Sequence, residues 1–156
     1  MSPADLLAAL GRRGWTIATA ESLTGGRVVA TLVEVPGASA VVRGGIVAYA
    51  TDVKHSQLKV DADLLASAGP VDPAVAWQMA EGARSQLGAD VGLATTGVAG
   101  PDPQDGKPVG TVHIAVVTPV STSVSSLELT GTREQIRAET VRRVLELCAE
   151  DIANAG

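Results

Sequence analysis

Two kinds of periodicity alternate along this chain: apolar residues at helical spacing, and short apolar runs typical of buried strands. Ser2 and Pro3 ahead of Leu6, Leu7 and Leu10 are typical of a capped amphipathic helix. The expected helices cover 3–10, 27–35, a short segment from 52, another from 61, a longer segment from 73, and 132–153. The expected strands cover 15–20, 44–49, 91–96, 110–117 and 121–129.

The order of these elements predicts the fold class. Helices and strands alternate over the first two thirds of the chain, and two strands joined by a turn at 118–120 precede the last helix. Such alternation favours parallel strands covered by helices on both faces, and the late pair adds antiparallel strands. We therefore expect an α/β protein in which residues 1–156 form a single three-layer α/β/α domain with a mixed, mainly parallel sheet.

The chain is more apolar than its size requires. Hydrophobic residues make up 46% of its 156 positions, and its mean hydropathy is +0.23. A core rich in Ala and Val is one explanation, and apolar surface covered by a second subunit is another. We expect both to contribute, so we predict a homodimer or larger assembly with the helix at 27–35 as its interface.

Charge and composition narrow the choice of partners. The net charge of −5 and the low aromatic content of 2% argue against nucleic acid. No apolar run reaches the roughly 18 residues that a membrane span needs, and no N-terminal signal sequence is recognisable. Cys148, the only cysteine, lies in an apolar helical pattern that indicates packing. We therefore expect a cytoplasmic protein with neither nucleic-acid nor membrane partners.

Familiar cofactor and metal motifs are absent from the sequence. There is no G-x-G-x-x-G fingerprint and no H-E-x-x-H, and the only two histidines, His55 and His113, are far apart. His113 falls within a strand pattern, which favours a packed or sheet-face role. We expect neither a cofactor nor a metal ion.

The first candidate for chemistry is Ser22, in the turn between the strand at 15–20 and the helix at 27–35. Ligands gather at such strand ends in α/β sheets, and Gly25 and Gly26 would let backbone N–H groups approach an anion. That anion would be a substrate phosphate or a developing oxyanion. The plainer interpretation, a serine or threonine that only caps the helix, has equal weight from the residues alone.

A serine nucleophile needs a base, and Lys54 is one of only three lysines in the chain. It follows Tyr49 by five positions, at the start of a short helix. A lysine serves as a base when burial lowers its pKa, although a surface lysine is the commoner case. The pair also resembles the tyrosine and lysine of short-chain dehydrogenases, but the spacing is one residue longer and the cofactor fingerprint is missing.

A third segment, at 95–102, ends a strand in two hydroxyl side chains and continues in glycines. A backbone nest there would suit a ribose, a phosphate or an amide, and an ordinary Gly/Pro turn is the alternative.

Together these segments resemble one family. The matching stretches are Ala20-Glu21-Ser22-Leu23-Thr24-Gly25-Gly26, Tyr49 to Lys54, Thr96-Gly97-Val98-Ala99-Gly100-Pro101-Asp102, and Lys107-Pro108-Val109-Gly110-Thr111-Val112. They are similar to the CinA C-terminal domain family, the nicotinamide-nucleotide amidohydrolases or NMN deamidases, over about residues 6–149. The departures from the family pattern, at Leu23, Thr51-Asp52, Thr95-Thr96 and the loop at 102–107, remove no proposed catalytic group.

The resemblance implies conversion of nicotinamide mononucleotide to nicotinic acid mononucleotide and ammonia. It implies Ser22 as the nucleophile, Lys54 as the base and Tyr49 in the proton relay. The implied substrate contacts are Glu21, Thr24, Gly25, Gly26, Thr96, Gly97, Gly100, Thr111, Arg133 and Arg137. Either arginine would bind the phosphate, and surface solvation explains both equally well. The rival interpretation is a non-catalytic nucleotide-binding or protein-interaction module of the same fold.

Overall fold

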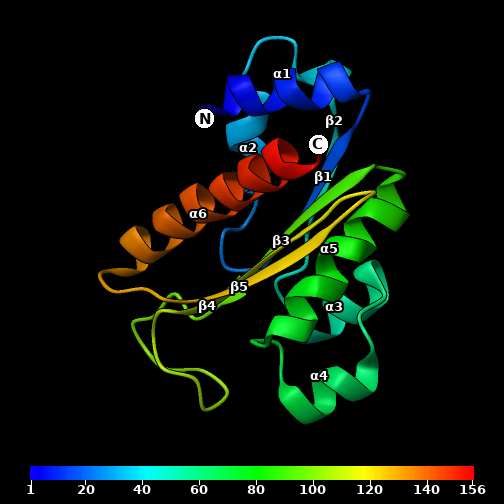
Figure 1. Cartoon of the computed structure of the whole chain (residues 1–156). Helices are drawn as coiled ribbons and strands as arrows, with labels where there is room; N and C mark the ends of the chain where they lie inside the picture. Colours follow the sequence, from blue (N-terminus) through cyan, green and yellow to red (C-terminus); the bar gives the residue numbers. More distant parts are fainter.

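The structure, a computed structural model, describes all 156 residues, and Figure 1 shows one sheet with helices on both faces. The strands are β1 (Ile17–Glu21), β2 (Val42–Val47), β3 (Val91–Gly97), β4 (Thr111–Val117) and β5 (Thr122–Glu128). The helices are α1 (Pro3–Arg13), α2 (Arg27–Val33), the 3₁₀ turn η1 (Ala38–Ala40), α3 (Thr51–Leu58), α4 (Ala62–Ala68), α5 (Pro73–Leu87) and α6 (Arg133–Asn154). None of the helices combines the length and apolar character needed to cross a membrane.

The sheet has the order β2-β1-β3-β4-β5 and is mixed. Strand β1 pairs in parallel with both β2 and β3, whereas β4 is antiparallel to both of its neighbours. All strands except β4 therefore run in the same direction, which confirms the mixed, mainly parallel sheet. Because β1, β2 and β3 are parallel, their carboxyl ends meet at one edge, where ligands bind in sheets of this kind.

Helices cover both faces of the sheet, so the predicted three layers are confirmed. On one face α1, α2 and α6 bury Leu10, Leu32 and Ile136 in a common cluster with β1, β3 and β4. On the other face α3, α4 and α5 pack Leu58, Met79 and other residues against the sheet. In Figure 1 the two groups of helices lie on opposite sides of the strands. Cys148 is fully buried in the first cluster, as its apolar surroundings in the sequence predict.

The element boundaries differ from the predictions mainly at the ends of strands. The first strand begins at Ile17 because the N–H of Trp15 still bonds the carbonyl of Leu10 and closes helix α1. Strand β2 covers 42–47 instead of 44–49, since beyond Val47 the chain turns away from the sheet to begin α3. The turn η1, which follows Pro36-Gly37, was not predicted.

Two glycines let α5 lie close to its neighbours and thereby hold α3 in place. A Cβ atom on Gly82 would collide with the carbonyl of Leu58, the last residue of α3. A Cβ atom on Gly92 of β3 would collide with the carbonyl of Ala80 in α5. Close backbone approach of this kind requires glycine. The packing matters for the site, because α3 carries Lys54.

Candidate active site

Ser22 lies directly after β1, at the edge where the parallel strands end. Its N–H donates to the carbonyl of Thr95 in the neighbouring β3, at 3.1 Å. Its side chain lines a small cavity whose other walls come from α3, from the segment at 70–71 and from the loop that follows β3. The turn predicted to carry the nucleophile therefore does face a cavity.

Lys54 points into the same cavity from α3 and is only 1% exposed. Its ammonium nitrogen, Nζ, lies 3.0 Å from the hydroxyl oxygen of Ser22. Nζ also donates to two backbone carbonyls, those of Ala48 at 2.8 Å and Tyr49 at 3.1 Å. The structure thus brings together the serine and the lysine, which are 32 positions apart in the sequence.

These three partners define what the lysine can do in each protonation state. An ammonium group has three N–H donors, and here they match two carbonyls and one hydroxyl. A neutral amine has two donors and one lone pair. Carbonyl oxygens can only accept hydrogen bonds, so the two N–H groups of the neutral amine stay bonded to the two carbonyls. The lone pair of the amine then faces the Ser22 hydroxyl. The two carbonyls therefore orient the amine as a base toward the serine.

Burial makes the neutral amine accessible near physiological pH. Removing the charged form from water lowers the pKa of Lys54 from its ordinary value of 10.5 to about 8. No acidic side chain forms an ion pair with Lys54 to restore the charged form. A lysine with such a pKa can take up a proton and return it, as general acid–base catalysis requires.

Tyr49 contributes its backbone to the lysine and its side chain to the mouth of the cavity. The side chain is 63% exposed, and its hydroxyl accepts a hydrogen bond from Arg133 at 3.3 Å. Only its carbonyl contacts Lys54. The structure therefore shows no hydrogen bond between this hydroxyl and Lys54, and the relay through it stays a prediction. Tyr49 lies beyond the end of β2, where strand alternation no longer determines which way a side chain points.

Four predicted substrate contacts lie outside the cavity: Glu21, Thr24, Gly25 and Gly26. The Glu21 carboxylate is buried and accepts the N–H of Gly26 at 3.2 Å and the hydroxyl of Thr24 at 2.7 Å. The N–H of Gly25 donates to the carbonyl of Ser22 at 3.1 Å. These groups are already paired within the protein, so in the structure they support the turn, and their role as substrate contacts stays a prediction.

The loop after β3 supplies most of the predicted substrate contacts that do line the cavity. Thr96, Gly97 and Gly100 are all on its wall. The Thr96 hydroxyl donates to the carbonyl of Pro70 at 2.7 Å and so joins two walls of the cavity. Thr111 does not reach the cavity, since its hydroxyl bonds the carbonyl of Pro108 at 2.8 Å and closes the far end of the loop. The structure thus places the Thr111 hydroxyl in a loop contact, and its role as a substrate contact stays a prediction.

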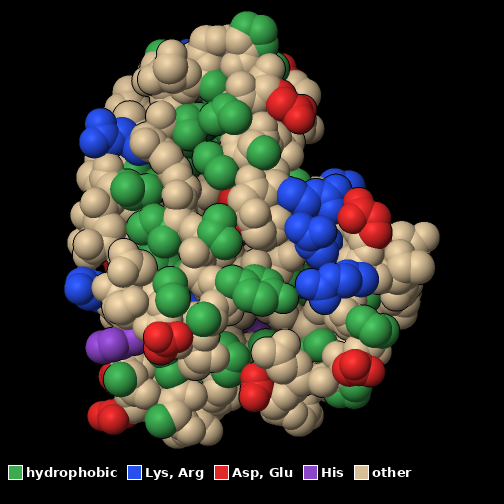
Figure 2. All heavy atoms as spheres, turned by 180° about the vertical axis from the view of Figure 1, so that it is seen from behind, with side chains coloured by type: hydrophobic (Ala, Val, Ile, Leu, Met, Phe, Trp, Pro, Cys, Tyr) green, Lys and Arg blue, Asp and Glu red, His purple; other side chains and the backbone are tan.

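The two predicted arginines differ in position. Arg133, at the start of α6, lies on the cavity wall and donates to the carbonyl of Gly100 at 2.6 Å. Arg137 lies one turn later and donates to the carbonyls of Leu23 and Thr24, outside the cavity. Figure 2 shows basic side chains gathered around an acidic one on one side of the molecule. Arg27 forms an ion pair with Glu134, the neighbour of Arg133 in α6, at 3.0 Å.

Several wall residues were not proposed as contacts from the sequence. Asp102 and Gln104 extend the polar wall contributed by the loop, and Pro70 and Val71 close the opposite side. Asp102 belongs to the matching segment and could have been proposed from it. The segment at 70–71 could not be proposed from the sequence, because its residues carry no reactive or charged group. It reaches the cavity wall only because the connection from α4 to α5 passes there.

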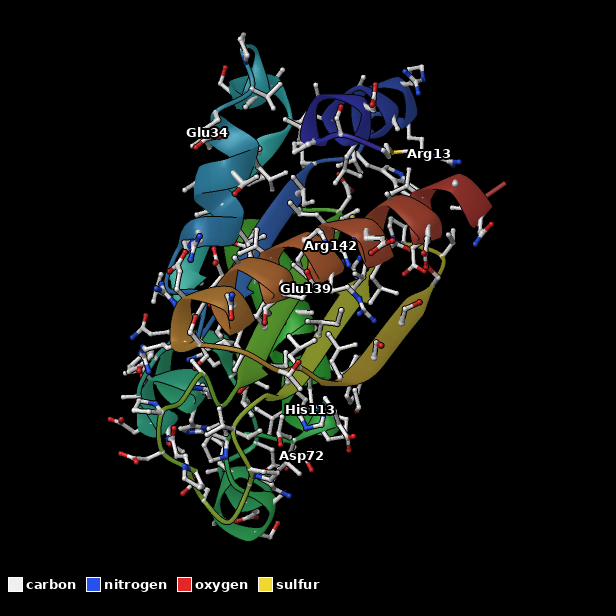
Figure 3. All side chains as sticks on the ribbon, turned by 90° about the vertical axis from the view of Figure 1, so that its left-hand side faces the viewer. Arg13, Glu34, Asp72, His113, Glu139 and Arg142 are labelled. Atoms are coloured by element: carbon white, nitrogen blue, oxygen red, sulfur yellow. The ribbon has the colours of Figure 1, made fainter.

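His113 lies apart from this cavity, on β4. Its Nδ1 pairs with the hydroxyl of Ser126 at 2.8 Å, and Figure 3 shows it close to Asp72 at the start of α5. Burial lowers its pKa, and the nearby Asp72 opposes that effect. No three His, Cys, Asp or Glu side chains converge in the structure as a metal-binding group.

Comparisons with known proteins agree on one family. Residues 2–152 match the family model described as the CinA C-terminal domain. A CinA-like protein of Frankia casuarinae is 52% identical over 148 residues, which cover 95% of this chain and 34% of that protein. A CinA-like protein of Anaeromyxobacter is 45% identical over 148 residues, which cover 93% and 36%. The chain thus spans about a third of the length of these curated relatives.

Solved structures match over almost their whole length. A protein of the competence-damaged protein (CinA) superfamily from Klebsiella pneumoniae superimposes with a TM-score of 0.92 at 33% identity, covering 97% of this chain and 95% of that one. The competence/damage inducible protein CihA of Agrobacterium tumefaciens superimposes with a TM-score of 0.85 at 35% identity, covering 96% and 97%.

The buried lysine should make stability depend on pH in the alkaline range. Between the folded pKa of about 8 and the higher value in the unfolded chain, the unfolded state binds more protons, so the free energy of unfolding rises with pH. We expect wild type to gain about 2 kcal/mol relative to Lys54→Met between about pH 7 and pH 9.5. Urea unfolding of wild type and Lys54→Met at both pH values measures this difference in the free energy of unfolding. An equal change in the two proteins would contradict the burial of a titrating amine.

Proposed function

This chain belongs to the CinA C-terminal domain family, and on that premise we propose that it is an amidohydrolase with Ser22 as nucleophile and Lys54 as base. The observation that carries the proposal is the contact of 3.0 Å between the lysine Nζ and the serine hydroxyl inside a cavity. A nucleophile within hydrogen-bond reach of a base, which is itself oriented by further groups, is the general arrangement of covalent catalysis.

The proposed reaction proceeds in two halves. Ser22 Oγ attacks the carboxamide carbon while its proton passes to the neutral amine of Lys54. The protonated lysine then delivers that proton to the departing nitrogen, ammonia leaves, and an acyl-enzyme ester remains. Water attacks the ester with Lys54 again accepting a proton, and the return of this proton to Ser22 Oγ releases the carboxylate product.

The oxyanion of the tetrahedral intermediate needs donors close to Ser22. The N–H groups of Gly25 and Gly26, which the sequence suggested, already donate within the turn. The N–H groups of Leu23 and Ala99 donate to no protein acceptor, and both residues line the cavity. Buried N–H groups without partners are rare in folded proteins. We assign these two N–H groups to the oxyanion.

The size of the cavity supports a small amide head on a larger molecule. Its volume is about 80 Å³, whereas sites that enclose a whole drug-sized ligand are typically ~300 Å³ or more. Only the carboxamide end would enter, and the remainder would lie at the mouth beside Tyr49 and Arg133. An arginine there suits a phosphate. These features support nicotinamide mononucleotide as the substrate and nicotinic acid mononucleotide as the product.

The direct test is release of ammonia from nicotinamide mononucleotide by the purified chain. We expect wild type to release ammonia and Ser22→Ala to show no turnover, because that variant lacks the atom that forms the acyl ester. Circular dichroism and ligand affinity should be nearly unchanged, since the hydroxyl contacts only Lys54. If wild type releases no ammonia from this nucleotide, from nicotinamide or from related amides, the rival interpretation as a binding module is favoured.

The rate of that reaction should follow the ionisation of Lys54. Because the neutral amine is the base, kcat/KM should rise with pH and level off above an apparent pKa near 8. Lys54→Met should lose activity over the whole accessible pH range. Tyr49→Phe should retain most activity and the same profile, because its hydroxyl contacts Arg133 and not the lysine. A flat profile in wild type would contradict the serine–lysine pair.

We also propose that a second copy covers the apolar surface along α2 and β2. Val33 in α2 is 56% exposed and Val47 at the end of β2 is 47% exposed. Figure 2 shows hydrophobic side chains spread over one face of the molecule. Because β2 is an edge strand close to the cavity mouth, a partner there would add a wall to the site. Light scattering at micromolar concentration should give the mass of a dimer or larger assembly, and a fully active monomer would contradict this.

A further inference from the structure

Glu21 is a buried acidic residue that the proposed mechanism does not use. It is the last residue of β1, directly precedes Ser22, and is 1% exposed. No arginine, lysine or histidine forms an ion pair with it. Burying a carboxylate without a counter-ion is costly unless hydrogen bonds replace water. Its surroundings must therefore supply those hydrogen bonds.

Five donors surround this carboxylate, and three of them are backbone N–H groups at the start of α2. Oε1 accepts the N–H groups of Gly26 at 3.2 Å and Val28 at 2.8 Å, and Oε2 accepts that of Val29 at 3.0 Å. The helix has no side-chain cap of its own, since its N-cap is Gly26. Glu21 thus caps α2 from the neighbouring strand, where the negative charge also matches the helix dipole.

Of the two remaining donors, the Thr19 hydroxyl bonds Oε2 at 3.2 Å, and the Thr24 hydroxyl connects the carboxylate to the backbone of Ser22. Because a carboxylate only accepts, the Thr24 hydroxyl donates its proton to Glu21, at 2.7 Å. The 2.8 Å contact between the hydroxyls of Thr24 and Thr95 must then be donated by Thr95. The Thr95 oxygen remains free to accept the N–H of Ser22, at 3.4 Å. A chain of hydrogen bonds therefore runs from Ser22 through two threonines to Glu21.

The geometry points to Glu21 as the positioning residue for the nucleophile. The carboxylate joins the two ends of the turn that carries Ser22, at β1 and at α2, and the threonines join that turn to β3. Neither Glu21 nor Thr24 lines the cavity. We propose that this network holds the serine oxygen at its 3.0 Å distance from Lys54, and that Glu21 touches neither substrate nor base. The inference rests on the proposed role of Ser22 as nucleophile.

The test measures the reactivity of Ser22 without the nucleotide. Phenylmethylsulfonyl fluoride is added to the full chain, and sulfonylation of Ser22 is followed by intact mass and peptide mapping. In this step the serine oxygen bonds to sulfur, fluoride leaves, and the serine proton passes to Lys54. We expect Glu21→Gln to slow the labelling about 10-fold to 100-fold, because misplacing a reacting group by ~1 Å has effects of that size.

A second pair of variants isolates the network from helix capping. Thr24→Val breaks the hydrogen-bond chain without removing the carboxylate, so it should slow the labelling of Ser22. Thr24→Ser keeps the hydroxyl, so this variant should be labelled at about the wild-type rate. The pair also decides the question if Glu21→Gln does not fold. With the amide substrate, each slow variant should lose kcat while KM stays within about twofold, because the altered side chains lie outside the cavity.

Ser2→Ala is the matched control for lost capping. Ser2 caps α1 through the N–H of Asp5, far from the cavity, so this variant should lower Tm and leave the labelling rate unchanged. Folded Glu21→Gln or Thr24→Val protein labelled at the wild-type rate would overturn the role of Glu21. If the wild-type protein is not labelled at Ser22, that result would instead contradict the role of Ser22 as nucleophile, on which this inference rests.

Discussion

The contact between the buried amine of Lys54 and the hydroxyl of Ser22 is the interaction on which the rest of the site depends. An amine with a normal pKa would stay charged at neutral pH and could accept no proton. Here burial lowers the pKa to about 8, and the carbonyls of Ala48 and Tyr49 hold two of its donors. The helix that carries this amine packs closely on α5 at Gly82, and Lys54 is only 1% exposed, the burial that lowers its pKa.

This arrangement requires that the fold bring a strand end and a helix together with little freedom. The turn after β1 is held from β3 by the carbonyl and hydroxyl of Thr95, and from α2 by the Glu21 carboxylate. Lys54 is held by α3, which packs against Gly82 of α5. Ser22 and Lys54 are thus supported from opposite faces of the sheet, and their contact depends on both layers being in place.

The sequence predicted the elements and the pairing of Ser22 with Lys54 better than it predicted the contacts that support this pair. Periodicity and caps located every major helix and strand, because those signals are local. The direction of Glu21 is not determined locally: the resemblance implies a substrate contact, and only the placement of α2 beside β1 shows that the carboxylate caps this helix. The same holds for Tyr49, because its hydroxyl pairs with Arg133 of α6, a residue 84 positions away in the sequence. Spacing along the chain carries no signal for such contacts.

The distribution of charge connects these supports to the proposed substrate. The carboxylate of Glu21, the residue before Ser22, is engaged by N–H groups of α2 and by two threonine hydroxyls, and it does not line the cavity, where Asp102 is the only acidic residue. The inner end of the cavity holds Lys54, whose pKa burial lowers to about 8, so that above this pH the amine is mainly neutral and suits an uncharged carboxamide. Arg133 places positive charge at the outer end. A molecule with a neutral amide at one end and an anion at the other therefore matches both ends of the cavity. In the proposed reaction the product carries a new carboxylate at the inner end. Protonated Lys54 is the only cation there that would retain this carboxylate.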